Sequence, residues 1–228
     1  MSVQRLALFD LDDTLVDRQL AFSAWAAGFA DEHGLGDEAS RWLITADKRG
    51  TGPRDQYFRV VREHFGLAAA AEELWAAFRA QMPDLVRCDS QVLDGLTQLR
   101  ASGWRVGIVS NGMADNQLMK IERSGLGERV DACCVSGDVG IRKPDVRIFQ
   151  LAAERCGRNL ADGGWMIGDN PEHDIAGGRA AGLGTMWVSG QRLWPGGESR
   201  ADRTVADAAT AISLLLDGSW RQHRWSQP

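Results

Sequence analysis

The chain has 228 residues, of which 44% are apolar and 25% charged, and its formal net charge is −5. These values are typical of a globular protein with one core and a smaller attached domain. The sequence contains neither a Lys/Arg-rich run nor an apolar stretch of about 18 residues, so we expect no nucleic-acid binding and no membrane span.

Five short apolar runs predict buried strands. The runs are residues 5–9, 104–109, 132–135, 165–168 and 185–188. Amphipathic stretches between the later runs predict helices at residues 92–101, 115–124, 146–156 and 175–181. Residues 205–216 predict one more short strand or turn, followed by a helix. Strands that alternate with helices are typical of the α/β class, so we predict a Rossmann-like parallel sheet flanked by helices.

Residues 17–89 interrupt this alternation, because they contain no convincing strand. Their patterns predict helices at residues 19–33, 39–45, 57–65 and 69–81. We therefore expect an all-helical domain at 17–89, inserted into an α/β catalytic core made of residues 1–16 and 90–228. A basic loop that contains Gly and Pro, residues 48–55, lies inside the insertion.

The first predicted strand runs directly into an acidic cluster made of Asp10, Asp12 and Asp13. Carboxylates this close repel one another and stay ionised together only beside a cation or strong hydrogen-bond donors. One of them can serve as a nucleophile and metal ligand while another moves protons. The alternative is an acidic turn without a chemical role.

Two further polar segments follow predicted strands. Ser110, Asn111 and Gly112 offer a hydroxyl and backbone N–H groups that suit a phosphate oxygen, although the same tripeptide also makes ordinary turns. Lys143, which Pro144 follows, is a candidate fixed positive charge that offsets the carboxylates. Its alternative is a solvated turn that opens a helix, because Pro suits a first helical position.

The fourth strand is followed by Asp169 and then by Asp174. Acidic oxygen ligands without cysteine suit a hard cation. His173 lies between them, but no second histidine stands at ligand spacing, so we interpret it as a surface or hinge residue rather than a zinc ligand.

These features, in this order, resemble the haloacid dehalogenase-like hydrolase superfamily, and the resemblance covers nearly the whole chain. It implies that Asp10 is the nucleophile and a metal ligand. It implies that Asp12 is the general acid/base and binds the metal through its backbone carbonyl. Ser110 matches the hydroxyl that binds the transferring phosphoryl group, and Lys143 matches the lysine that balances charge at the nucleophile.

The resemblance also implies a Mg²⁺ site, in which Asp169 matches the acidic metal ligand and Asp174 the second carboxylate near the metal. Thr14 matches the residue that closes the first motif. We therefore include Thr14 in the substrate-binding set with Asn111 and Gly112.

Asp12 separates the branches of this superfamily. The dehalogenase branch lacks an acid at this position, because a departing halide needs no proton, whereas the alkoxide of a phosphomonoester needs one. The phosphonate-cleaving branch also lacks this acid and uses a lysine of the inserted domain, for which Lys48 is the candidate here. Asp12 therefore favours phosphoryl transfer. At Asp13 many relatives carry Gly, a departure that leaves the reaction class unchanged.

The helical insertion resembles the cap domain of this superfamily. The resemblance implies that the cap closes over the site and excludes water, with hinges near residues 16–18 and 87–90. Basic and aromatic cap residues are candidates for substrate selection, with ordinary surface charge as an equal alternative. They are Arg18, Lys48, Arg49, Arg54 and Tyr57.

We thus predict a Mg²⁺-dependent phosphatase that acts on a small phosphorylated metabolite, as a monomer or homodimer. A phosphomutase, a 2-haloacid dehalogenase and a non-catalytic binding module on the same fold are the alternatives. The four cysteines form no C-x-x-C pair and the apolar stretch before Asp10 is too short for a signal peptide, so we expect a cytoplasmic protein.

Overall fold

The computed structural model describes residues 5–47, 52–195 and 200–219. The chain divides into two compact units. One, the α/β unit, consists of the residues up to Val16 and those from Cys88 onward, and the other, the helical unit, is Asp17–Arg87. This division falls two residues before the end of the predicted insertion, at 89. Among the described residues no helix has both the length and the apolar character that crossing a bilayer requires.

The α/β unit is built on a sheet of six strands in the order β3-β2-β1-β4-β5-β6. All neighbouring strands are parallel. The strands are β1 (Leu6–Phe9), β2 (Arg105–Ser110), β3 (Ala132–Val135), β4 (Trp165–Gly168), β5 (Gly184–Val188) and β6 (Arg203–Val205). The predicted α/β class with a Rossmann-like parallel sheet is confirmed. The strand order reverses direction at β1, and open α/β sheets bind ligands beyond the carboxyl ends of the strands at such a point.

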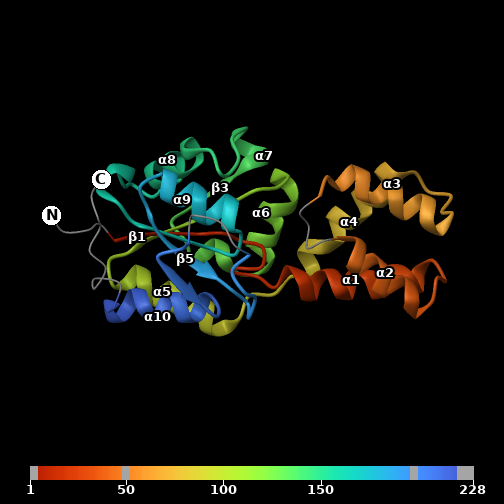
Figure 1. Cartoon of the computed structure of the whole chain (residues 1–228), viewed down its shortest axis with the longest axis horizontal. Helices are drawn as coiled ribbons and strands as arrows, with labels where there is room; N and C mark the ends of the chain where they lie inside the picture. The colour runs from red at the N-terminus through yellow and green to blue at the C-terminus, as the bar shows by residue number, and fades with distance from the viewer. Residues whose placement is uncertain (1–4, 48–51, 196–199, 220–228) are drawn as a thin grey trace. The chain divides into compact units, whose positions relative to one another are not determined.

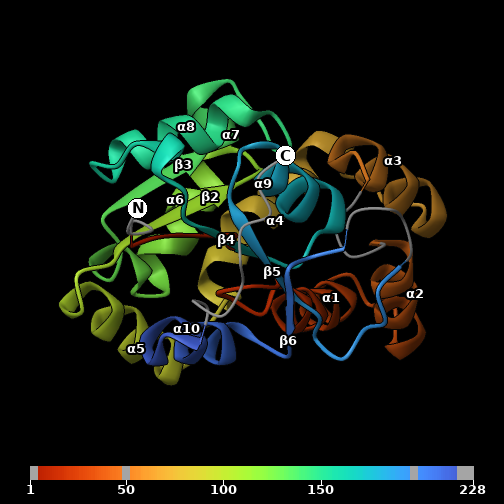
Figure 2. The ribbon, with the colours of Figure 1, turned by 60° about the vertical axis from the view of Figure 1, so that its left-hand side comes forward.

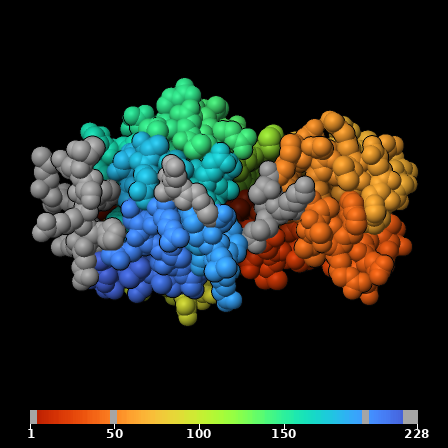
Figure 3. Space-filling model, in the orientation of Figure 1, coloured from red at the N-terminus to blue at the C-terminus, as the bar shows by residue number. Residues whose placement is uncertain are grey.

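Helices cover both faces of this sheet (Figures 1 and 2). Helices α5 and α10 pack side by side on one face, while α8 and α9 lie on the other. Figure 3 shows part of the surface that the α/β unit presents, with α8 and α9 in green to light blue. The helices are α5 (Ser90–Ala101), α6 (Ala114–Arg123), α7 (Ser136–Val139), α8 (Val146–Arg155), α9 (Gly177–Ala180) and α10 (Ala208–Asp217), with short helical turns at Leu126–Glu128, Leu160–Asp162 and Pro171–Ala176.

Strand β1 is buried along its whole length, which explains why its sequence is continuously apolar. Leu6 and Leu8 pack into a core that includes Val109 and Phe149. The first polar side chain after this strand is that of Asp10. Its backbone N–H donates to the carbonyl of Ile167 at 2.8 Å, which extends the β1–β4 ladder by one residue. The first carboxylate of the acidic cluster therefore follows directly after the buried strand.

The helical unit consists of α1 (Arg18–Glu32), α2 (Asp37–Asp47), α3 (Arg54–Phe65) and α4 (Ala71–Leu85). An aromatic cluster forms its core, in which the rings of Trp25 and Phe78 meet edge to face with centroids 4.8 Å apart. Phe22 and Phe58 pack against the same tryptophan. Trp25 is 3% exposed, so it is a packing residue.

Two arginines of the helical unit share one buried carboxylate. Arg18 donates to both oxygens of Asp47 at 2.8 and 3.0 Å, and Arg54 also donates to Asp47. Burial raises the pKa of Asp47, but the hydrogen bonds and charges of Arg18 and Arg54 outweigh it, so this pKa lies below its ordinary value. The ionised form of Asp47 thus stabilises the fold above pH 4 or so, and this contribution is lost as the pH falls through the lowered pKa.

Replacing Asp47 by Asn should lower the free energy of unfolding at pH 7 by about 3 kcal/mol, because two arginines lose their buried partner. The deficit should be smaller at acid pH, because the wild type also loses the charge of Asp47 as the pH falls through its lowered pKa. Urea unfolding followed by circular dichroism at both pH values measures this. Asp55→Asn, which breaks the exposed pair with Arg59, is the matched control and should change stability by under ~1 kcal/mol. Equal effects of the two variants would contradict the prediction.

Candidate active site

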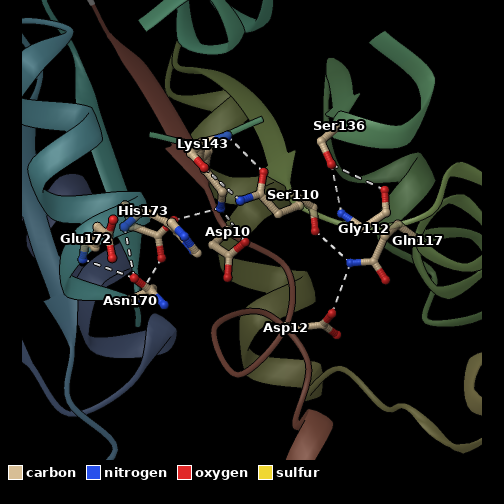
Figure 4. A network of polar contacts seen from close by, with 12 residues as sticks. Asp10, Asp12, Ser110, Gly112, Gln117, Ser136, Lys143, Asn170, Glu172 and His173 are labelled. Carbon is tan, nitrogen blue, oxygen red and sulfur yellow. Dashed lines mark hydrogen bonds and ion pairs between the residues drawn. The ribbon is translucent and has the colours of Figure 1, made fainter. Parts of the chain in front are cut away.

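Asp10 and Asp174 are joined by one buried ammonium group. Lys143 Nζ donates to Asp10 Oδ1 at 2.6 Å and to Asp174 Oδ1 at 2.7 Å (Figure 4). Lys143 is 2% exposed and Asp174 is fully buried. Asp10 follows β1 and Asp174 lies in the turn after β4, so the sheet brings together residues that are far apart in the sequence.

Asp169 completes a group of three carboxylates with Asp10 and Asp174, whose oxygens lie within 4.8 Å of one another. The turn after β4 makes this approach possible. Asp174 lies against the backbone of Gly168, where a Cβ atom would collide with its carboxylate. The backbone N–H of Asn170 donates to Asp174 Oδ2 at 2.9 Å, while the Asn170 side chain caps the helical turn Pro171–Ala176.

The charges in this group do not balance, because two cations, Lys143 and the Arg192 that contacts Asp169, face three carboxylates. Burial is the largest cause that raises the pKa of Asp10 well above its ordinary value. Lys143 opposes this rise, while Asp174 and Asp169 add to it. Burial lowers the pKa of Lys143, but Asp10 and Asp174 outweigh it and hold that pKa above its ordinary value. Lys143 is therefore charged, but the three carboxylates carry more negative charge than their cationic neighbours offset.

Asp12 points to a different set of partners. Lys120 Nζ contacts its two carboxylate oxygens at 2.8 and 2.9 Å. Gln117 Nε2 donates to Asp12 Oδ2 at 3.0 Å and to Ser110 Oγ at 2.7 Å (Figure 4). The backbone turns directly after Asp12, where Asp13 adopts a positive φ of 58°. Gln117 and Lys120 were not singled out from the sequence.

The segment after β2 is held by hydrogen bonds on both sides. Asn111 donates to the backbone carbonyl of Lys143 at 3.0 Å and accepts from its N–H at 2.9 Å, so it fixes the backbone of the lysine. The backbone N–H of Gly112 donates to Ser136 Oγ at 3.0 Å. Ser110 itself is 1% exposed. Asn111 thus acts on Lys143, and the Gly112 N–H already has a partner within the chain.

The family model for haloacid dehalogenase-like hydrolases matches residues 4–182. The chain belongs to the haloacid dehalogenase-like hydrolase family. Its α/β unit, its acidic cluster and its strand-end serine and lysine are therefore parts of a hydrolase.

Relatives of this haloacid dehalogenase-like chain include several phosphatases. A phosphoserine phosphatase of Thermus thermophilus is 33% identical over 75% of this chain and 70% of the relative. A ribulose-1,5-bisphosphate 5-phosphatase of Halopiger xanaduensis is 30% identical over 89% of this chain and 90% of the relative. The magnesium-bound crystal structure of the HAD-hydrolase YfnB from Bacillus subtilis has the same fold. It superposes with a TM-score of 0.74 at 23% identity over 94% of this chain and 99% of YfnB.

The residues present fit the Mg²⁺ ion that this haloacid dehalogenase-like family implies. Asp10, Asp169 and Asp174 offer oxygen donors alone, which Mg²⁺ prefers. Opposite oxygens around a six-coordinate Mg²⁺ lie about 4.2 Å apart, close to the spread of these carboxylates. The uncompensated negative charge and the raised pKa of Asp10 are further reasons for a cation here.

Asp169 has a cationic neighbour that sequence analysis missed. Arg192 donates to Asp169 Oδ2 at 3.0 Å, and its guanidinium lies over the ring of Trp187. Trp187 Nε1 in turn donates to the backbone carbonyl of Asp169 at 2.8 Å. Arg192 lies in the loop after β5, and neither its spacing nor the local composition marks it as a site residue in the sequence.

The remaining predicted binding residues include members of both units. Arg18 and Arg54 belong to the helical unit, where both are engaged with Asp47. Arg49 and Lys48 lie outside the described residues. Thr14 lies in the turn after Asp13, and within the described part of the chain its buried hydroxyl oxygen has no hydrogen-bond partner. Half-buried His173 lies beside Asp174, and burial is the main cause that lowers its pKa.

Proposed function

We propose that the chain is a Mg²⁺-dependent phosphatase that hydrolyses a small phosphomonoester through an aspartyl-phosphate on Asp10. The observation that carries the proposal is the convergence of Asp10, Asp169 and Asp174 at the carboxyl ends of the strands, with Lys143 bridging the first and the last of them. The phosphatases among the relatives support the same reaction class.

Asp10 is the proposed nucleophile. Its carboxylate oxygen forms a bond to phosphorus while the ester oxygen leaves, and water then releases phosphate from the aspartyl-phosphate. Mg²⁺ held by Asp10, the Asp12 carbonyl and Asp169, with Asp174 nearby, would supply the positive charge that lets a carboxylate approach a phosphate dianion. Lys143, which contacts Asp10, and Ser110 at the end of β2 would bind the phosphoryl oxygens.

Asp12 is the proposed proton carrier. It gives a proton to the leaving alkoxide in the first step and takes one from the attacking water in the second. A halide needs no such proton, so the carboxyl group of Asp12, fixed by Lys120 and Gln117, favours a phosphatase over a dehalogenase.

The test is phosphate release by the purified chain over a panel of small phosphomonoesters, with and without Mg²⁺. We expect steady release with Mg²⁺, a fall to background after dialysis against EDTA, and recovery when Mg²⁺ is returned. Full activity in EDTA would contradict the metal requirement. Conversion of a sugar phosphate into its isomer without release of phosphate would indicate a phosphomutase instead.

We further propose that the helical unit serves as a cap that selects the substrate. Arg49 remains a candidate contact from the sequence. Arg18 and Arg54 stabilise the helical unit through Asp47, so any role in substrate binding would add to a structural one. A cytoplasmic location and a monomeric or dimeric state remain predictions.

A further inference from the structure

Helix α6 buries polar side chains where a helix beside a sheet usually buries apolar ones. Gln117 is 2% exposed and Lys120 is 3% exposed, whereas Leu118 and Met119 of the same helix are 44% and 42% exposed. Lysine is almost never buried to this degree without a partner, because the desolvated charge is costly. This inverted pattern indicates that the inner face of α6 serves the site rather than the core.

Both buried side chains donate hydrogen bonds to the carboxylate of Asp12. Lys120 lies across its two oxygens at 2.8 and 2.9 Å, and Gln117 donates to one of them at 3.0 Å. The same Gln117 nitrogen donates to Ser110 Oγ at 2.7 Å, so one amide group links Asp12 to the serine (Figure 4). The opposite amide orientation would set the Gln117 oxygen against a carboxylate, so the donor side must face Asp12.

Gly112 provides the space that this arrangement needs. A Cβ atom at Gly112 would lie 2.7 Å from Cγ and 2.9 Å from Cδ of Gln117. The glycine of the Ser110–Gly112 segment therefore lets the Gln117 side chain pass close to the backbone on its way to Asp12. Gln117 and Lys120 are three residues apart, which places them on one face of α6.

We propose that Lys120 and Gln117 are positioning residues that fix the carboxyl group of Asp12 relative to the hydroxyl of Ser110. The inference rests on the proposed function, in which Asp12 exchanges the proton and Ser110 binds the phosphoryl group. The carboxyl group must face the same reacting oxygen in both steps, so one fixed orientation serves both. Without Lys120, Asp12 can rotate about its side-chain bonds and lose this alignment.

The test compares two esters that differ in their need for a proton. p-Nitrophenolate is a stable anion that leaves without a proton, whereas the alkoxide of glycerol 3-phosphate needs a proton in order to leave. In Lys120→Met and in Gln117→Leu we expect kcat/KM for glycerol phosphate to fall about 100-fold. For p-nitrophenyl phosphate we expect a fall of less than about tenfold. Lys120→Arg, which keeps the charge, should recover part of the loss.

Controls separate positioning from folding. Arg123→Met removes the same charge from the exposed side of α6 and should leave the ratio of the two esters unchanged. In an Asp12→Asn background, Lys120→Met should not change this ratio further, because its effect passes through Asp12. Thermal unfolding checks that each variant folds. If Lys120→Met does not fold, Gln117→Leu provides the test instead.

Equal losses on both esters would overturn the positioning role alone. A wild-type chain that releases no phosphate from either ester with Mg²⁺ would overturn the proposed function as well.

Discussion

Replacing Asp10 by Asn should lower phosphate release by at least ~10³-fold while leaving the fold intact. An amide oxygen is a poor nucleophile, so the aspartyl-phosphate cannot form. The amide can still accept the hydrogen bond that Lys143 Nζ makes at 2.6 Å. Steady-state phosphate release measures the loss, and thermal unfolding without metal measures the stability.

Stability gives this prediction a second readout. The pKa of Asp10 is raised by burial and by its neighbouring carboxylates, so the ionised group destabilises the metal-free fold at neutral pH. Asp10→Asn should therefore unfold at the same temperature as the wild type or a higher one. Asp13→Asn is the matched control, because Asn tolerates the positive φ of this residue and Asp13 has no role in the proposed mechanism. Near-normal turnover by Asp10→Asn would rule out the covalent mechanism.

The sheet and the residues at its strand ends could be predicted because both depend on local signals. Apolar runs buried on two faces mark the central strands, and parallel strands place their carboxyl ends at one edge. Asp10, Asp174 and Lys143 meet there as a consequence. Strand β6 was less clear, because Arg203–Val205 is short and gains its order from pairing with β5.

The partners of Asp12 could not be predicted, because the apolar pattern of α6 is misleading. Leu118 and Met119 suggest a core-facing side, yet they are exposed while Gln117 and Lys120 are buried. The available signal was the helical spacing of Gln117 and Lys120 with Ile121, which is also buried. The sequence pattern does not indicate which acidic side chain a lysine far along the chain will contact in the folded protein.

The basic residues of the helical unit illustrate the same limit. Arg18 and Arg54 have the charge expected of residues that bind an anionic substrate, which is why the sequence suggests that role. In the structure both contact Asp47, at the end of α2. Charge alone does not distinguish a substrate contact from a buried ion pair, because the partner is set by tertiary packing.

Replacing Lys143 by Met should both stop turnover and destabilise the metal-free protein by about 3–5 kcal/mol at pH 7 to 8. The loss leaves Asp10 and Asp174 buried without the ammonium group that contacts both at 2.6 and 2.7 Å. Without the opposing charge of Lys143, the neighbouring carboxylate of Asp174 raises the pKa of Asp10 further above that of the unfolded chain. A carboxyl group with a raised folded-state pKa binds more protons when folded, so stability increases as the pH falls toward that pKa.

The deficit of Lys143→Met should therefore shrink between pH 8 and about pH 5, and Mg²⁺ should reduce it at neutral pH by replacing the lost positive charge. Urea unfolding across this pH range, with and without Mg²⁺, measures both effects. Arg147→Met removes the same charge from an exposed pair with Asp145 and should change stability by under ~1 kcal/mol at every pH. A deficit for Lys143→Met that is independent of pH and Mg²⁺ would mean that Lys143 contributes packing alone. The charge of Lys143 would then not offset the repulsion between the carboxylates, and the electrostatic basis of the site would be wrong.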